Sequence, residues 1–379
     1  MIQSAYIHIP FCHQICHYCD FNKVFLKGQP VDDYLNYLDL EMRNTLERFP
    51  TSELKTIFIG GGTPTSLNES QLTKLLESIH SHLPTVAKNV EFTIEANPGD
   101  LSKAKLDILQ QGGVNRLSVG VQSFNDELLT KIGRTHKSKD VYEGLERARK
   151  IGFNNISIDL IYSLPNQTIV DFKDTLHKAL SLQLEHFSAY SLIIEPKTVF
   201  YNLMRKGSLQ LPTQENEAKM YEILMDQMEL KGYFQYEISN FSKPEFESRH
   251  NLTYWNNEEY YGFGAGAHGY LKGVRNVNAG PLKKYMALVE EKGLPYVEEH
   301  IVTKNEKMEE EMFLGLRRMK GVHIKDFQAK YDQSMFDVFG RQINENVERG
   351  LLQINDENIS LTRNGKLLGN EVFQTFLLT

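Results

Sequence analysis

The sequence predicts an α/β fold built around a parallel sheet, on the evidence of its apolar runs and their order. Short runs rich in Ile, Val, Leu and Phe recur along the first half of the chain, separated by longer segments with helical spacing. The expected strands are residues 5–9, 56–59, 91–96, 116–121, 156–161 and 186–192. Strands that alternate with helices form right-handed crossovers and therefore a parallel sheet. Six such units are fewer than a closed eight-unit barrel needs, which favours an open or partial barrel.

Helical segments connect these strands. Apolar residues recur in them every three or four positions, which places these side chains on one face of a helix. The expected helices are residues 31–48, 71–82, 139–151 and 170–182. Folds of this kind bind ligands at the carboxyl ends of the strands, so the residues that follow each strand are the first candidates for a site.

The rest of the chain divides into two regions. Residues 196–303 contain one amphipathic helix, 214–231, and an aromatic-rich stretch, 233–270, without clear periodicity. We interpret this region as an extension of a barrel formed by residues 1–195. Residues 304–379 contain helical segments, a predicted hairpin and a last helix, an order that is typical of a winged-helix-like α+β domain.

Composition excludes several classes of protein. Of the 379 residues, 41% are apolar and 24% are charged, which is ordinary for a soluble globular protein. No apolar run approaches the roughly 18 residues of a membrane span. The net charge is −7, and residues 304–379 carry 11 Lys and Arg against 12 Asp and Glu, which argues against nucleic acid as a partner. The first residues show no signal segment, so we expect a cytoplasmic protein.

The three cysteines, Cys12, Cys16 and Cys19, lie within eight residues directly after the first predicted strand. Three thiolates on one short loop can bind three irons of a [4Fe–4S] cluster and leave the fourth iron open to a small molecule. A zinc site usually needs four ligands in paired spacings, and only the two histidines beside these cysteines are at hand to complete one. Covalent haem attachment needs Cys-x-x-Cys-His, and Asp20 stands where that histidine would be. The spacing therefore favours a cluster.

A glycine-rich turn follows the second predicted strand, in the sequence Gly60-Gly61-Gly62-Thr63. Glycines allow backbone groups to approach a ligand closely. A plain tight turn would have the same composition. The parallel topology places this turn beside the cysteine loop, and that position makes it a candidate for ligand binding.

Polar residues interrupt or follow three further predicted strands. Glu95, Gln122 and Asp159 fall at matching depths in otherwise apolar runs. A buried carboxylate is costly unless it is paired or hydrogen-bonded. Three such positions in neighbouring strands indicate the mouth of a ligand site rather than three separate core residues. Arg134 can supply a cation nearby, although a solvated surface arginine explains it equally well.

Two motifs of the aromatic-rich region leave their roles open. Residues 264–269, Gly-Ala-Gly-Ala-His-Gly, match the dinucleotide-binding pattern only formally, because no strand clearly precedes them and no helix follows. We interpret them as a glycine-rich loop. His250, in His-Asn-Leu-Thr-Tyr-Trp, is either a haem ligand backed by aromatic rings or a structural histidine, and its own surroundings favour the structural role.

Together these motifs resemble those of radical S-adenosylmethionine (SAM) proteins over nearly the whole chain. The spacing Cys-x-x-x-Cys-x-x-Cys, with Tyr18 before the last cysteine, is the mark of that family. The flanking motifs Tyr-Ile-His-Ile-Pro-Phe-Cys and Gly-Gly-Gly-Thr-Pro-Thr resemble the group that contains oxygen-independent coproporphyrinogen III oxidase and the HemW-type haem chaperones. The resemblance implies a partial (β/α)6 radical-SAM barrel with a small C-terminal domain.

The resemblance also implies roles for the candidate residues. Cys12, Cys16 and Cys19 would bind the [4Fe–4S] cluster, and SAM would chelate its fourth iron through amino and carboxylate groups. The positions that match SAM contacts of the oxidase are Tyr6, Gly61, Gly62, Thr63, Glu95, Gln122, Arg134 and Asp159.

Two branches of this group differ at two motifs. The oxidase has a further cysteine two residues after the third, where this chain has Phe21. The haem-chaperone branch has Asp-Phe there and a His-Asn-x-x-Tyr-Trp motif downstream, and this chain matches both, the second at residues 250–255. We therefore expect a protein that binds haem, with His250 as the candidate contact, and delivers it to haem-dependent respiratory enzymes. The alternative is the oxidase itself, which decarboxylates coproporphyrinogen III. Homodimer formation and peripheral membrane contact stay open.

Overall fold

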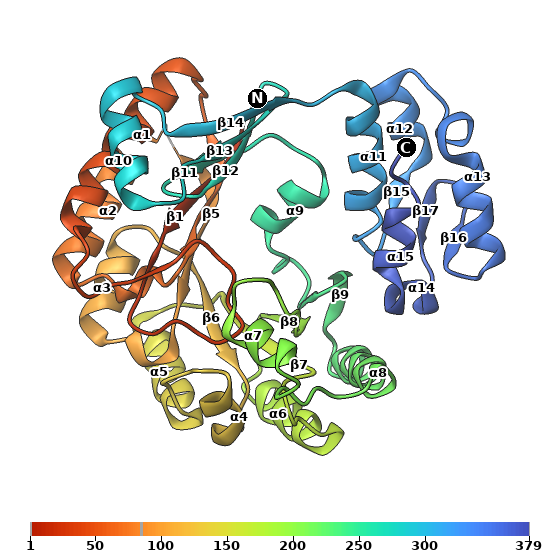
Figure 1. Cartoon of the computed structure of the whole chain (residues 1–379), viewed down its shortest axis with the longest axis horizontal. Helices are drawn as coiled ribbons and strands as arrows, with labels where there is room; N and C mark the ends of the chain where they lie inside the picture. The colour runs from red at the N-terminus through yellow and green to blue at the C-terminus, as the bar shows by residue number, and fades with distance from the viewer. Residues whose placement is uncertain (1, 84–85, 379) are drawn as a thin grey trace.

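The computed structural model describes residues 2–83 and 86–378, and it confirms the predicted α/β fold (Figure 1). The main sheet consists of β1 Ser4–Ile9, β4 Leu54–Gly61, β5 Val86–Ala96, β6 Arg116–Gln122, β7 Ile156–Tyr162, β8 His186–Ser191, β9 Phe234–Glu237, β10 Asn240–Ser242 and β11 Tyr261–Phe263. Their order across the sheet is β11-β1-β4-β5-β6-β7-β8-β10-β9. Every pair from β11 to β8 is parallel, and β10 is antiparallel to both of its neighbours. The six predicted strands therefore lie side by side in sequence order.

Helices between these strands cover one face of the sheet (Figure 1). They are α1 Val31–Arg48, α2 Glu69–His82, α3 Lys103–Gln111, α4 Asp126–Lys131, α5 Ser138–Ile151 and α6 Ile169–Ser181. Helix α1 buries Tyr34, Leu35, Leu38 and Met42, which recur at helical spacing and pack in the main core. Helix α2 begins two residues before the predicted start because Asn68 caps it in a capping box.

A short helix, α9 Arg249–Trp255, closes the other face of the sheet (Figure 1). Helix α9 lies against the amino ends of three strands. The Thr253 hydroxyl is 2.8 Å from that of Ser4, and the Glu91 carboxylate accepts the backbone N–H groups of Arg249 and His250, both at 2.9 Å. The lumen of the partial barrel is therefore closed at the bottom and open at the carboxyl ends of the strands.

The region 196–303 supplies more regular structure than its sequence pattern indicates. Besides β9, β10 and β11, it contains α7 Val199–Arg205, α8 Gln214–Leu230, α10 Leu282–Lys292 and a sheet of β12 His268–Leu271, β13 Val274–Asn278 and β14 Tyr296–Ile301. The expectation that no strand precedes residues 264–269 is wrong, because β11 ends at Phe263. A strand of three residues is too short to show periodicity, and pairing with β1 defines it. Residues 264–267 still form a loop, with positive φ at Gly264 and Gly266.

The C-terminal region has its own hydrophobic core, built around Met312, Phe327, Phe339 and Ile343. Its elements are α11 Lys304–Gly315, β15 Val322–His323, α12 Ile324–Tyr331, α13 Met335–Glu348, β16 Leu352–Ile354, β17 Asn358–Leu361, α14 Arg363–Leu367 and α15 Gly369–Gln374. Helix, strand, two helices and a β-hairpin follow one another, which confirms the winged-helix-like prediction. Over the described residues, no helix has both the length and the apolar character that crossing a membrane requires.

Candidate cluster and cofactor site

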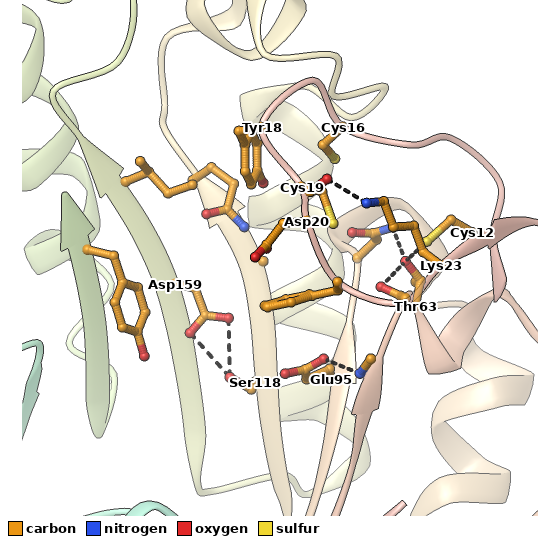
Figure 2. A pocket seen from close by; sticks show the side chains of 18 of the residues that line it. Cys12, Cys16, Tyr18, Cys19, Asp20, Lys23, Thr63, Glu95, Ser118 and Asp159 are labelled. Carbon is orange, nitrogen blue, oxygen red and sulfur yellow. Dashed lines mark hydrogen bonds between the residues drawn. The ribbon is translucent and has the colours of Figure 1, made fainter. Parts of the chain in front are cut away.

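A cavity of about 500 Å³ lies on the polar side of the sheet, towards the carboxyl ends of its strands. It brings together ten of the twelve residues that the sequence singles out. These are Cys12, Cys16, Cys19, Gly61, Gly62, Thr63, Glu95, Gln122, Arg134 and Asp159. Figure 2 shows the three cysteines on one loop above the strands that carry Glu95 and Asp159. Segments that are far apart in sequence therefore meet at one site.

The cysteine loop is held in place by other segments of the chain. The backbone N–H of His17 donates to the carbonyl oxygen of Ile132 at 3.0 Å, and the His17 Nδ1 atom lies 2.9 Å from the carbonyl oxygen of Lys131. On the far side of the loop, Asn22 donates from Nδ2 to the carbonyl oxygen of Ala265 at 2.8 Å. The Lys23 ammonium donates to the carbonyl oxygen of Cys19 at 2.6 Å. These contacts fix the loop from both sides.

The thiols themselves are partly withdrawn from solvent. Burial raises the pKa of Cys12 to about 11 and also raises the pKa of Cys19. The Thr63 hydroxyl donates to the Cys12 sulfur at 3.6 Å. Thiols with raised pKa values stay protonated at neutral pH until a metal displaces the protons, so metal binding here releases protons.

Close approach to neighbouring residues explains two glycines of the turn. A Cβ on Gly62 would lie 2.9 Å from the Cys12 sulfur, and a Cβ on Gly61 would lie 2.7 Å from the ring of His8. Gly61 also has a φ of 119°, which L side chains rarely adopt. Its N–H donates to the Glu95 carboxyl group at 3.0 Å. The turn is therefore a close-packed wall of the site.

Two buried acids and Arg134 contribute to the electrostatics of the cavity, which Arg116 also lines. Burial, with a smaller contribution from the nearby Asp159, raises the pKa of Glu95 to about 8, so this carboxyl group is protonated at neutral pH. Burial also raises the pKa of Asp159, whose two oxygens each accept from the Ser118 hydroxyl at 3.3 Å. Arg134 donates to the Asn97 side chain at 2.7 Å and to the carbonyl oxygen of Gly120 at 2.9 Å. The cavity thus offers both a fixed cation and hydrogen-bonding carboxyl groups.

Gln122 occupies a strained position at the end of β6. Its φ is 66°, and the register between β6 and β7 shifts between Gly120 and Gln122. A bulge of this kind turns a side chain away from the regular alternation of the strand and is common beside functional sites. Here the Gln122 amide lines the cavity. The amide is therefore available to a ligand.

Tyr6 and His250 lie behind the cavity wall rather than in it. The Tyr6 hydroxyl is 3.0 Å from His8 Nδ1, and both Tyr6 and His250 stack on Phe58, which lines the cavity. His250 is 1% exposed, with Nδ1 2.8 Å from the Thr56 hydroxyl and Nε2 2.8 Å from the Tyr254 hydroxyl. Iron ligation by His250 would require one of these hydrogen bonds to break. Its contact with haem stays a prediction.

The cavity also contains residues that the motif search missed. Arg116, Ser118, Ser188 and Tyr190 line it without belonging to any motif that the sequence analysis singled out as a site, and Asn251 lines it from the motif of His250. On β6 the inward residues alternate with core residues at a period of two. That alternation, applied to the strands already recognised, was the signal that could have identified the residues on β6 and β8.

Comparison with known proteins places this site in a family. The family model of the radical SAM superfamily matches residues 6–179, and that of the HemN C-terminal domain matches residues 302–368. The chain is 58% identical over 376 residues to the haem chaperone HemW of Bacillus subtilis (strain 168), covering 99% of each chain. It is 49% identical to HemW of Lactococcus lactis subsp. lactis (strain IL1403), covering 99% of this chain and 97% of the relative. It is 34% identical to HemW of Escherichia coli (strain K12), covering 99% and 98%.

A solved structure agrees with these sequence matches. The radical SAM enzyme coproporphyrinogen III oxidase (HemN) from Escherichia coli superposes with a TM-score of 0.87 at 25% identity, covering 99% of this chain and 90% of that one. Because the match covers almost the whole chain, it supports the predicted fold of the C-terminal domain as well as that of the barrel.

The residues of this cavity fit the cofactors that the superfamily implies, a [4Fe–4S] cluster and SAM. Over residues 2–83 and 86–378, no three His, Cys, Asp or Glu side chains are placed to hold a single metal ion. A cluster makes a different demand, because each of its cysteines binds a separate iron. Among the described residues the enclosed Arg134 Nε atom has no hydrogen-bond acceptor, and the Gln122 amide lines the cavity, so both can donate to an organic ligand beside the thiols. When bound, these cofactors would supply one-electron chemistry, and the residues of the cavity would hold and orient them.

Near-complete coverage by relatives at 34–58% identity, together with the thiol-lined cavity, gives one conclusion. This chain belongs to the HemW family of radical SAM proteins.

Proposed function

We propose that this protein is a haem chaperone, which binds haem and transfers it to haem-dependent respiratory enzymes while it carries a [4Fe–4S] cluster and SAM. The relatives that match almost its whole length are named haem chaperones. The structural observation that carries the proposal is an apolar rim, formed by Phe21, Tyr190 and Ile193, at the thiol-lined cavity.

The apolar rim suits a flat apolar ligand. Phe21 is 60% exposed and Ile193 is 64% exposed, although both belong to a cavity whose floor is polar. Exposed apolar side chains that gather at a cavity mark a binding surface. Phe21 stands where the oxidase has a further cysteine. Haem combines a flat apolar ring with two carboxylate arms, and the rim can cover the ring.

The cofactor roles follow from position in the cavity. We propose that Cys12, Cys16 and Cys19 bind the cluster and that SAM is held by the glycine turn and the polar strand ends. The proposed SAM contacts are Gly61, Gly62, Thr63, Glu95, Gln122, Arg134 and Asp159, with Tyr6 supporting them through Phe58.

The second candidate function is oxygen-independent coproporphyrinogen III oxidation, which the structural similarity to HemN favours. One anaerobic experiment separates the two. The cluster-loaded protein is offered either haem or coproporphyrinogen III with SAM and a reductant. We expect stoichiometric haem binding and passage of that haem to an apo-respiratory enzyme. Formation of protoporphyrinogen over many turnovers would instead establish the oxidase.

His250 gives a prediction about the haem ligand. Burial, and secondarily the charge of Arg116, lower the pKa of His250 to about 3, so its imidazole is neutral and able to bind iron. We expect His250→Ala to weaken haem binding at least about tenfold, or ~1.4 kcal/mol, and to leave the cluster absorbance intact. Tyr254→Phe removes the partner of Nε2 and should preserve or strengthen haem binding. Titrations that show equal haem affinity for wild type and His250→Ala would remove His250 from the site.

Location and assembly remain predictions. We place the protein in the cytoplasm and expect any contact with membrane enzymes to be peripheral. Cell fractionation tests the first statement, and the mass of the haem-loaded protein in solution tests whether it forms a homodimer.

A further inference from the structure

Arg116 is a buried cation without a partner. It is 2% exposed, begins strand β6 and lines the cavity. Within residues 2–83 and 86–378 its side chain makes no hydrogen bond or ion pair, and its Nε atom is enclosed with nothing to accept its proton. A buried guanidinium normally has hydrogen-bonded or charged partners, because leaving water is costly. The lack of such partners at Arg116 therefore calls for a physical explanation.

Other buried charged side chains near the cavity have hydrogen-bond partners, unlike Arg116. Arg134 donates two hydrogen bonds, to Asn97 and to Gly120. Glu91 accepts two backbone N–H groups of helix α9. Asp159 accepts hydrogen bonds from the Ser118 hydroxyl; burial raises its pKa, and the positive charge of Arg116 opposes that rise without an ion pair between the two side chains. None of these described groups forms a hydrogen bond or an ion pair with Arg116.

The surroundings of Arg116 resemble a receptor for an anion. Ser118, two residues further along β6, and Ser188 of β8 are buried and line the same cavity, as does Asn251 of helix α9. Hydroxyl and amide groups can add hydrogen bonds to an anion held by a guanidinium. The floor of the cavity is therefore polar and contains the Arg116 guanidinium, whereas the apolar rim lies where the cavity meets solvent.

We propose that Arg116 binds a carboxylate of the cavity's ligand and that, on the proposed haem-chaperone function, this carboxylate is a propionate of haem. A guanidinium presents two parallel N–H groups that match the two oxygens of a carboxylate. The second carboxylate source is SAM, whose own carboxylate the family resemblance assigns to the open iron near the cysteines. An amphipathic ligand with its ring at the apolar rim and one arm on Arg116 matches both ends of the cavity.

The test compares haem with a form that has no free carboxylate. Cluster-loaded wild type, Arg116→Gln, Arg116→Lys and the control Arg147→Gln are titrated anaerobically with haem and with haem dimethyl ester. Arg147 lies on helix α5 and contacts the carbonyl oxygen of Leu101, away from the cavity. We expect Arg116→Gln to weaken haem binding at least tenfold, Arg116→Lys to weaken it less, and neither to change affinity for the diester.

Each other outcome is decisive. Equal affinity of wild type for haem and diester, unaffected by Arg116→Gln, overturns the role of Arg116 and leaves the chaperone function standing. Wild type that binds neither compound overturns both. If Arg116→Gln weakens SAM binding and spares haem, the anion is the SAM carboxylate and the propionate assignment is wrong.

A stability measurement distinguishes a ligand-binding arginine from a structural one. Because no described residue forms a hydrogen bond or an ion pair with Arg116, Arg116→Gln should raise the thermal midpoint of the ligand-free protein relative to Arg147→Gln. A clear fall of the midpoint would show that Arg116 stabilises the fold by contacts of its own, which would overturn the proposal.

Discussion

Cys16→Ser is expected to remove the [4Fe–4S] cluster from the anaerobically reconstituted protein. A serine hydroxyl does not replace a thiolate as a ligand of iron, and two remaining cysteines cannot hold a cluster that needs three. Cys16 is partly exposed, whereas Cys12 belongs to the buried core, so the change at Cys16 alters the ligand without opening a cavity. Iron and sulfide content and the visible absorbance of the cluster measure the result.

His13→Gln is the matched control for Cys16→Ser. His13 neighbours Cys12 in the same loop and is exposed. A cluster bound by three cysteines is unaffected by this change, whereas a zinc site completed by a histidine would lose its metal. A protein that binds zinc and shows no iron-dependent absorbance would overturn the cluster assignment, and so would Cys16→Ser that retains full iron content.

Glu41→Ala is expected to lower the free energy of unfolding by at least about 3 kcal/mol, because it leaves three buried donors unpaired at about 1–3 kcal/mol each. Glu41 on α1 is completely buried and accepts from three groups. These are the Gly264 N–H at 2.8 Å, the Asn278 amide at 2.7 Å and the Tyr285 hydroxyl at 2.5 Å. Urea unfolding monitored by circular dichroism measures the change, and the exposed Glu47 on the same helix provides the control Glu47→Ala.

The same carboxyl group gives a pH dependence with a definite sign. Burial raises the pKa of Glu41 from 4.5 to about 7 against the opposing effect of its hydrogen bonds. The folded state then binds the proton more tightly than the unfolded state, so the free energy of unfolding falls as the pH rises from about 4.5 to about 7. The difference in the free energy of unfolding between wild type and Glu41→Gln should therefore fall by a few kcal/mol over this pH range. A difference that is flat between pH 5 and pH 7.5 would contradict it.

Glu41 also connects stability to the cofactor site. It holds the loop of residues 264–267, whose Ala265 carbonyl oxygen accepts from Asn22 directly after the cysteine loop. We therefore expect the Glu41→Ala protein to bind the cluster less firmly than wild type, even under conditions in which the variant remains folded.

The regular order of the first half of the chain was predictable because its signals are local. Strand and helix periodicity depends only on residues that are close together in the sequence. Strand β11 was missed because three residues carry no period, and its place beside β1 depends on residues more than 250 positions away. The short strands of the aromatic-rich region could not be predicted for the same reason.

A cluster-binding role for the cysteine loop could be predicted from the sequence alone, because three cysteines in eight residues can meet one cofactor without help from the rest of the chain. It also determined the polar positions of the strand ends and the family. Only the tertiary structure decided that His250 is hydrogen-bonded at both ring nitrogens, that Phe21 and Ile193 share one rim, and that Arg116 is buried without a partner. Burial and hydrogen-bond partners depend on residues distant in sequence, and therefore no local pattern records them.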